Sequence, residues 1–335
     1  MQSVRSPSGR RPEGEGRGID RPTRPVRMPR TGIPGQAPRV DQWWRRAWRR
    51  VTTPRPAVPD AVMLRGKPRA VAHPHPRPTL LHRRLAVVYD TAGPRVTLGV
   101  IWFAAVVGAL VIGPVAVVPL YAFVAGLAGF QAASVWRAEG SAADRWVALL
   151  AGSVVVVGAT WGVASMGLAI VAVTVLAVGV AVVGSRVPRR LFEAAGTTLQ
   201  CGLPAGVAAA GVVLTLRLEI GAAVTLVLFV AAYEVGDYLV GSGASSSIEG
   251  PIAGIVAMAA ICAAIAVLRV PPFDGGAVFV FGGFAALFCP LGQVAASALL
   301  PRADAPAPAL RRLDSLLLLG PAWPLLVGLL LQELS

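Results

Sequence analysis

The sequence predicts an all-α integral membrane protein, with about nine transmembrane helices preceded by a disordered basic tail. One observation is composition: of the 335 residues, 55% are hydrophobic and 14% are charged, whereas a soluble domain averages about 25% charged residues. The other is the distribution of charge. Residues 1–85 hold 20 of the 31 lysines and arginines, and residues 86–335 hold 11 basic and 12 acidic residues. These features exclude an ordinary cytosolic enzyme, a secreted disulfide scaffold and a coiled coil.

Residues 1–85 form an Arg/Pro-rich segment with 14 prolines and few large aliphatic side chains. Such a segment buries too little apolar surface to offset its ordering entropy, so we expect a disordered cytoplasmic tail. Within it, residues 43–50 read Trp-Trp-Arg-Arg-Ala-Trp-Arg-Arg. Because tryptophan favours the headgroup region and arginine is attracted to anionic lipid, this segment predicts contact with anionic headgroups. A solvated tail without a site is the competing interpretation. No nucleic-acid partner is expected, since basic charge alone is weak evidence for one.

Residues 86–335 form the predicted polytopic membrane domain. A helix needs about 20 apolar residues to cross the hydrocarbon layer, and windows of that size predict nine spans. Gly113-Pro114 alone separates the first span from the second, and Pro204 is expected in the first turn of the fifth, where proline is tolerated. The spans are expected near 96–113, 114–134, 146–163, 165–184, 201–218, 220–241, 252–268, 277–299 and 315–332.

Arginines in the loops predict the orientation of these spans. Cytoplasmic loops carry an excess of basic residues, and the basic tail places the N-terminus in the cytoplasm. We therefore expect a multi-pass protein of the cell (inner) membrane with its C-terminus outside. The loops expected inside carry Arg137, Arg145, Arg186, Arg189, Arg190, Arg302, Arg311 and Arg312, against Arg217 and Arg269 outside.

Acidic residues at the cytoplasmic ends of the spans are the candidate functional groups. Glu234 and Asp237 are three apart at the end of the sixth span and face the same side of a helix. Glu249 follows in the next loop, and Asp314 opens the ninth span. Ionisable groups near membrane depth are costly, and carboxylates suit Mg²⁺, which takes one or two of them together with substrate phosphates. Solvated helix ends for Asp237 and Glu249, and helix capping for Asp314, are the alternative interpretation.

These residues, in this order, resemble the phosphatidate cytidylyltransferase (CDP-diglyceride synthetase) family. Residues 311–316, Arg-Arg-Leu-Asp-Ser-Leu, with Pro321, stand in the register of the family's D-R-x-D-S-L followed by proline, with Arg311 in place of the first Asp. Residues 234–241 match D-x-G-A-Y-x-x-G with Glu for Asp, and residues 247–250 match the end of S-P-x-K-T-x-E-G. Residues 292–297 keep the Gly and Ser of G-D-L-x-E-S.

The resemblance implies that phosphatidate and CTP are converted into CDP-diacylglycerol and pyrophosphate, with Mg²⁺ as the cofactor. A homodimer is compatible with it. It implies catalytic roles for Asp314, Glu234 and Glu249, and metal binding by Asp314, Glu234 and Asp237. The substrate or phosphate ligands that it implies are Ser247, Ser297, Arg302, Arg311, Arg312 and Tyr238.

The chain also departs from the family pattern. Gln293 stands where the family has aspartate, and Leu300-Pro301 stand where it has K-R. The K-D and P-G-H-G-G elements are missing, and residues 86–335 contain no lysine. Such losses remove groups that neutralise phosphate charge and hold metal. Three functions therefore stay open: a divergent cytidylyltransferase, a non-catalytic lipid-binding or regulatory relative, and a small-solute transporter with buried carboxylates.

Overall fold

The computed structural model describes residues 94–184, 188–242, 248–273 and 276–334. All of them belong to one compact unit, residues 66–335. The predicted tail, with its Trp/Arg segment, lies outside the described residues, and so does Ser247.

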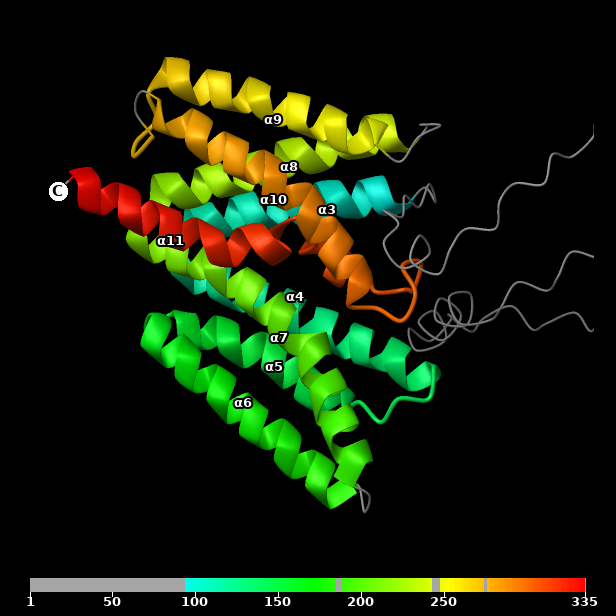
Figure 1. The fold of residues 1–335 in the computed structure, drawn as a ribbon. Helices are drawn as coiled ribbons and strands as arrows, with labels where there is room; N and C mark the ends of the chain where they lie inside the picture. The colour runs from blue at the N-terminus through cyan, green and yellow to red at the C-terminus, as the bar shows by residue number, and fades with distance from the viewer. Residues whose placement is uncertain (1–93, 185–187, 243–247, 274–275, 335) are drawn as a thin grey trace, which may run out of the picture. The chain divides into compact units, whose positions relative to one another are not determined.

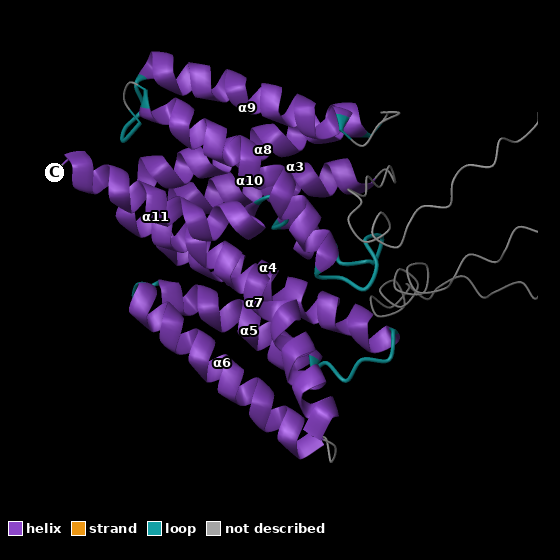
Figure 2. Cartoon of the chain, in the orientation of Figure 1, coloured by secondary structure: helices purple, strands orange, loops and turns teal. Residues whose placement is uncertain are grey.

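The described chain is helical throughout and contains no strand, which confirms the all-α prediction (Figures 1 and 2). Every predicted span overlaps one of its α-helices, and a short 3-10 helix, η1, precedes the last of them. The elements are α3 (Pro94–Ile112), α4 (Pro114–Ala138), α5 (Arg145–Ala159), α6 (Val163–Gly184), α7 (Pro188–Leu218), α8 (Ile220–Gly241), α9 (Glu249–Leu268), α10 (Ala277–Ala298), η1 (Leu310–Arg312) and α11 (Leu316–Leu334).

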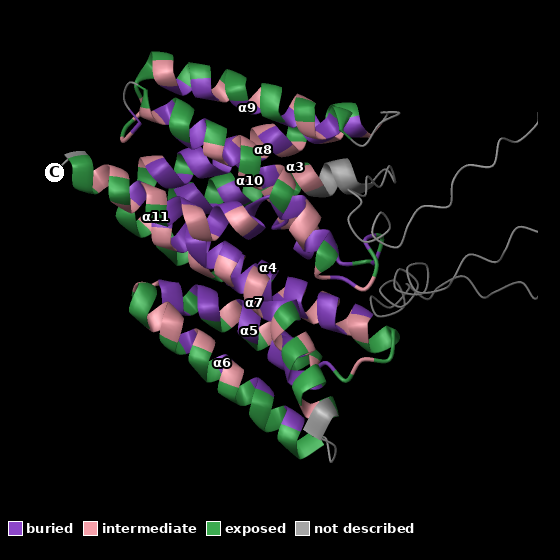
Figure 3. Ribbon diagram, viewed as in Figure 1, coloured by how far each residue is buried: buried purple, intermediate pink, exposed green. Residues whose placement is uncertain are grey.

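Seven of these helices are long and apolar enough to cross a membrane: α4, α6, α7, α8, α9, α10 and α11. The apolar part of α3, Gly99–Ile112, and α5 are shorter. Side chains on α6 and α9 are mostly exposed along the outer faces of these helices (Figure 3). Because those exposed side chains are apolar, the chain is a multi-pass membrane protein whose outer faces suit lipid.

Local signals explain where several helices begin. Gly113, with φ of 98°, separates α3 from α4, and Pro114 occupies the first turn of α4. The Asp144 carboxylate accepts hydrogen bonds from the backbone N–H groups of Trp146 and Val147, at 2.8 and 2.9 Å, and so caps α5.

The expected position of Pro204 is wrong. Helix α7 begins at Pro188, so Pro204 lies in its interior and not in its first turn. The first part of this helix carries polar side chains such as Glu193 and Gln200. A search for apolar windows therefore places the start of the helix too late.

The helices pack through small residues. A Cβ added to Gly211 of α7 would overlap the backbone of Gly320 in α11, and one added to Gly152 of α5 would overlap the backbone of Ala125 in α4. Helix backbones can therefore approach closely, as is common between membrane helices. Figure 1 shows α9 beside α8, and α6 beside α5 and α7.

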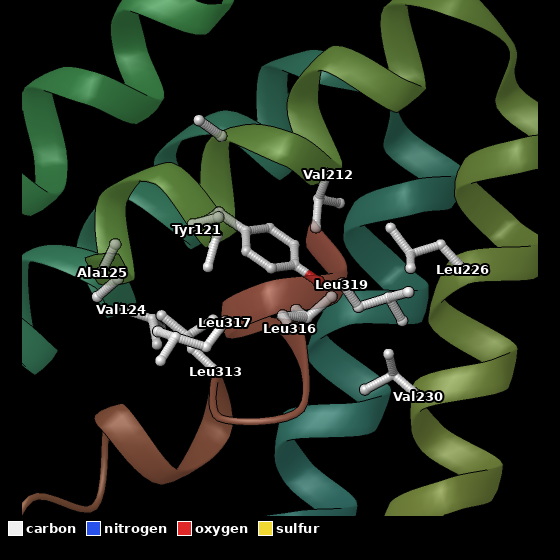
Figure 4. Packing of buried hydrophobic residues seen from close by; sticks show 14 of the residues in the cluster. Tyr121, Val124, Ala125, Val212, Leu226, Val230, Leu313, Leu316, Leu317 and Leu319 are labelled. Atoms are coloured by element: carbon white, nitrogen blue, oxygen red, sulfur yellow. The ribbon is translucent and has the colours of Figure 1, made fainter. Parts of the chain in front are cut away.

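The segment between α10 and α11 returns to the interior. Leu300, Leu310 and Leu313 are almost completely buried, and η1 packs against α4 and α10. Figure 4 shows Tyr121 of α4 reaching toward the beginning of α11, where Leu316 and Leu319 lie. This return places residues 311–315 among the helices and not in a solvated loop.

Candidate functional site

A cavity of about 730 Å³ lies between α3, α4, α8, α10 and the segment that precedes α11. Its apolar wall comes mainly from α3 and α8. Its polar lining consists of Tyr121, Glu234, Asp237, Tyr238, Gln293, Arg311, Arg312 and Asp314.

Three carboxylates meet at this cavity. Glu234 and Asp237 come from one face of α8, as their spacing predicts, and Asp314 comes from the returning segment. Glu234 interacts electrostatically with Asp314, Arg312 and Asp237, and Asp314 interacts with Arg311 and Asp237. Asp237 is 4% exposed and Asp314 is 8% exposed. The three side chains therefore form one charged cluster together with the two arginines.

One carboxylate oxygen in this cluster lacks a protein partner. Oε1 of Glu234 is buried and accepts no hydrogen bond from the described residues. Leaving a buried charged oxygen unsatisfied is costly. A ligand that supplied a positive charge or a hydrogen-bond donor there would remove that cost, so the cavity is suited to a bound cation.

A chain of buried hydrogen bonds connects α8 with α10. The Tyr233 hydroxyl donates to Oε1 of Gln293 at 3.0 Å, and Nε2 of Gln293 donates to Oδ2 of Asp237 at 3.0 Å. Tyr233, Gln293 and Asp237 are all buried. This chain fixes the orientation of the Asp237 carboxylate in the cavity wall.

The two arginines are held in different ways. Arg311 donates to the hydroxyl of Ser297 at 3.0 Å and to the carbonyl of Ala303. Ser297, predicted as a phosphate ligand, is fully buried and supports Arg311 instead of lining the cavity. Arg312 extends to α3, where a Cβ on Gly99 would lie 3.4 Å from its Nη1. Two guanidinium groups thus reach the cavity from adjacent positions.

The carboxylates of the cavity fit a Mg²⁺ ion whose coordination is completed by phosphate oxygens and water. Among the described residues, no three His, Cys, Asp or Glu side chains are arranged to hold a metal by themselves. Mg²⁺ commonly uses one or two carboxylates together with substrate phosphates and water. Glu234, with its unpaired oxygen, and Asp314 are the residues best placed to supply those carboxylates.

Besides Ser297, two predicted site residues are absent from the cavity lining. Glu249 is exposed in the first turn of α9, and its predicted catalytic role has no support from its position. The Arg302 side chain is 64% exposed and pairs with Glu139 at 3.4 Å and Asp304 at 3.9 Å. The loop that carries Arg302 runs along the surface before the chain returns inward.

The sequence reasoning missed the roles of two tyrosines. Tyr121 lines the cavity from α4, and Tyr233 begins the hydrogen-bond chain to Asp237. The chain contains 4 tyrosines, and Tyr121, Tyr233 and the predicted Tyr238 all belong to this region. A tyrosine within an apolar span usually needs a hydrogen-bond partner for its hydroxyl. That rule indicates from the sequence that Tyr121 and Tyr233 lie near other polar groups.

Comparison of the chain with protein-family models gives no match, and neither curated proteins nor solved structures give one. Assignment of a function to the cavity therefore depends on the sequence motifs and on the geometry of the described residues.

Proposed function

We propose that the protein is a membrane phosphatidate cytidylyltransferase, which converts CTP and phosphatidate into CDP-diacylglycerol and pyrophosphate. The observation that carries this proposal is the convergence of Glu234, Asp237 and Asp314 with Arg311 and Arg312 on one largely apolar cavity. Carboxylates of this kind suit a divalent cation, and arginines bind phosphate through paired hydrogen bonds. The resemblance of residues 234–241 and 311–316 to the family motifs supports the same activity.

The apolar wall of the cavity favours a lipid substrate. Val100 and Phe103 of α3, and Val235 and Leu239 of α8, line the cavity and are also 43–71% exposed. Helix α3 packs mainly against α4, so the cavity reaches the outer surface between α3 and α8. An acyl chain can lie along this wall while its phosphate reaches the charged end.

In the proposed reaction, Arg311 and Arg312 bind and orient phosphate groups of the two substrates. Glu234 and Asp314 would hold Mg²⁺, and the bound ion would neutralise charge on the CTP phosphates. An oxygen of the lipid phosphate attacks the α-phosphorus, and the bond to the β-phosphate oxygen breaks to release pyrophosphate. Tyr121 and Tyr238 line the same cavity, and a tyrosine hydroxyl can donate a hydrogen bond to a phosphate oxygen. Positioning and charge neutralisation are the main requirements of such transfers.

The membrane arrangement is part of the proposal. All nine α-helices of the described residues would cross the inner membrane, with α3 and α5 as the short spans, the N-terminus in the cytoplasm and the C-terminus outside. The arginines of the predicted inner loops support this orientation. The basic tail would contact anionic headgroups on the cytoplasmic surface.

The test is conversion of phosphatidate and radiolabelled CTP into CDP-diacylglycerol by the purified chain in lipid nanodiscs with Mg²⁺. Asp314→Asn removes a cavity carboxylate, while Asp304→Asn removes an exposed one from the preceding loop. We expect product from the wild type and Asp304→Asn, and a loss of at least a hundredfold in Asp314→Asn. Equal activity in the two variants would contradict the assigned site.

A lipid-binding protein without catalysis is the second candidate. The observation that favours it is Gln293, an amide where a further carboxylate would strengthen cation binding, together with the absence of lysine from residues 86–335. Phosphatidate binding by folded protein that yields no CDP-diacylglycerol would select this function.

A further inference from the structure

We infer that Gln293 is a positioning residue that restricts the cavity to a single divalent cation. The inference rests on the proposed function only in that the carboxylates of the cavity bind a cation. It concerns how many cations bind and which residue sets that number.

The orientation of the Gln293 amide follows from its two partners. An ionised carboxylate only accepts hydrogen bonds, so the nitrogen and not the oxygen of the amide must face Asp237. The oxygen then accepts from the Tyr233 hydroxyl, and both bonds measure 3.0 Å. Gln293 itself is 6% exposed, so water does not compete freely for either bond. The amide therefore holds one oxygen of Asp237 in a fixed direction.

The amide hydrogen occupies a place that suits a metal ion. Two oxygen ligands in adjacent positions of an octahedral Mg²⁺ ion, with bonds of about 2.1 Å, lie about 3 Å apart. Nε2 of Gln293 lies at that distance from Oδ2 of Asp237. If a carboxylate oxygen replaced this nitrogen, the two oxygens would form a ligand pair. The N–H group instead fills the gap and excludes a cation from it.

The charges of the cavity support a single cation. In their ionised forms, Glu234, Asp237 and Asp314 carry three negative charges, and Arg311 and Arg312 carry two positive ones. One divalent cation turns this net negative charge into a net positive charge, which attracts phosphate and opposes a second cation. A carboxylate at position 293 would add the negative charge that a second cation needs.

Ser297 provides a matched control within the same network. Its hydroxyl donates to the backbone carbonyl of Gln293 at 3.1 Å and accepts from Arg311 at 3.0 Å. Ser297→Ala therefore disturbs Arg311 without changing the carboxylates or the Gln293 amide. It should weaken phosphate binding and leave the number of cations unchanged.

The test measures Mn²⁺ binding to the full chain in nanodiscs. Equilibrium dialysis gives the number of bound ions, and electron paramagnetic resonance shows whether they are neighbours. Wild type and Ser297→Ala should each bind one Mn²⁺ at the cavity and give the spectrum of an isolated ion. Gln293→Glu, which keeps the side-chain length, should bind two and show the line broadening of two neighbouring ions. One Mn²⁺ in Gln293→Glu, or two in the wild type, would overturn the inference.

Tyr233→Phe covers the case in which Gln293→Glu does not fold. This variant removes the hydroxyl that anchors the amide oxygen, so the Gln293 amide holds the Asp237 carboxylate less firmly. We expect Mn²⁺ affinity to fall about threefold to tenfold, which matches the loss of one buried hydrogen bond, with one ion still bound. Unchanged affinity in folded Tyr233→Phe would overturn the positioning role.

The outcomes separate this inference from the proposed function. A wild type that binds one Mn²⁺ without making CDP-diacylglycerol refutes the activity and supports the inference. A wild type that binds none, beside Gln293→Glu that does bind Mn²⁺, removes the cation from the proposed function and also overturns the inference of a single-ion cavity. Absence of binding in both refutes the cation site and the inference together.

Discussion

Replacement of Gly292 by alanine should impair the site through a displacement of the backbone that carries Asp314. Gly292 of α10 lies directly against the carbonyl of Asp314, and an added Cβ would lie well under 3.0 Å from that oxygen. An ordinary contact between carbon and oxygen needs about 3.3 Å, so the two segments must separate by about 1 Å. A misplacement of about 1 Å can reduce catalysis about a hundredfold.

The variant should still fold, because overpacking of this kind typically costs about 1–3 kcal/mol. Gly283→Ala is the matched control: Gly283 lies on the same helix, and a Cβ there meets no atom within 4 Å. The assay compares CDP-diacylglycerol formation, Mn²⁺ affinity and the thermal unfolding temperature of both variants. If folded Gly292→Ala kept activity and Mn²⁺ affinity within threefold of Gly283→Ala, the assignment of Asp314 to the site would be refuted.

Three further substitutions give distinct results. Arg312→Gln should raise the KM for phosphatidate about tenfold to a hundredfold, because a hydrogen bond to a charged group contributes about 1.5–3 kcal/mol; an unchanged KM would place the phosphate elsewhere. Glu234→Gln removes a carboxylate that has one buried oxygen without a hydrogen-bond partner and that faces Asp314 and Asp237, so unfolding measured in chelator should show a gain of about 1–3 kcal/mol, while Mn²⁺ affinity falls at least tenfold. Lower stability would contradict this reading of Glu234. Trp323 is fully buried and its ring contacts Phe273 and Phe281, so Trp323→Ala should destabilise the fold by about 3–5 kcal/mol without changing the number of bound Mn²⁺ ions.

The helices were predictable because the membrane requires long apolar segments. The Gly113-Pro114 boundary is confirmed, since glycine at positive φ and proline in a first turn are local signals. The start of α7 was not predictable from hydropathy, because polar residues continue this helix beyond its apolar part. Its length depends on packing against α5 and α4, which no window of one segment contains.

The candidate site was predictable in part. Glu234, Asp237 and Asp314 stand out in sequence because charge is rare in apolar segments, and the structure brings them to one cavity. Their roles in binding and catalysis stay predictions. The contribution of Tyr121 and the surface position of Arg302 depend on which helices are neighbours and on the path of the loop after α10. Hydropathy and motif spacing determine neither of these.

The most direct test of the proposed site is a crystal structure of the chain with Mn²⁺ and CDP-diacylglycerol, in which anomalous scattering locates the metal. The prediction is one Mn²⁺ ion bound by Glu234 and Asp314, phosphates beside Arg311 and Arg312, and acyl chains along α3 and α8. An Mn²⁺ ion and headgroup found together outside this cavity would contradict the proposed site.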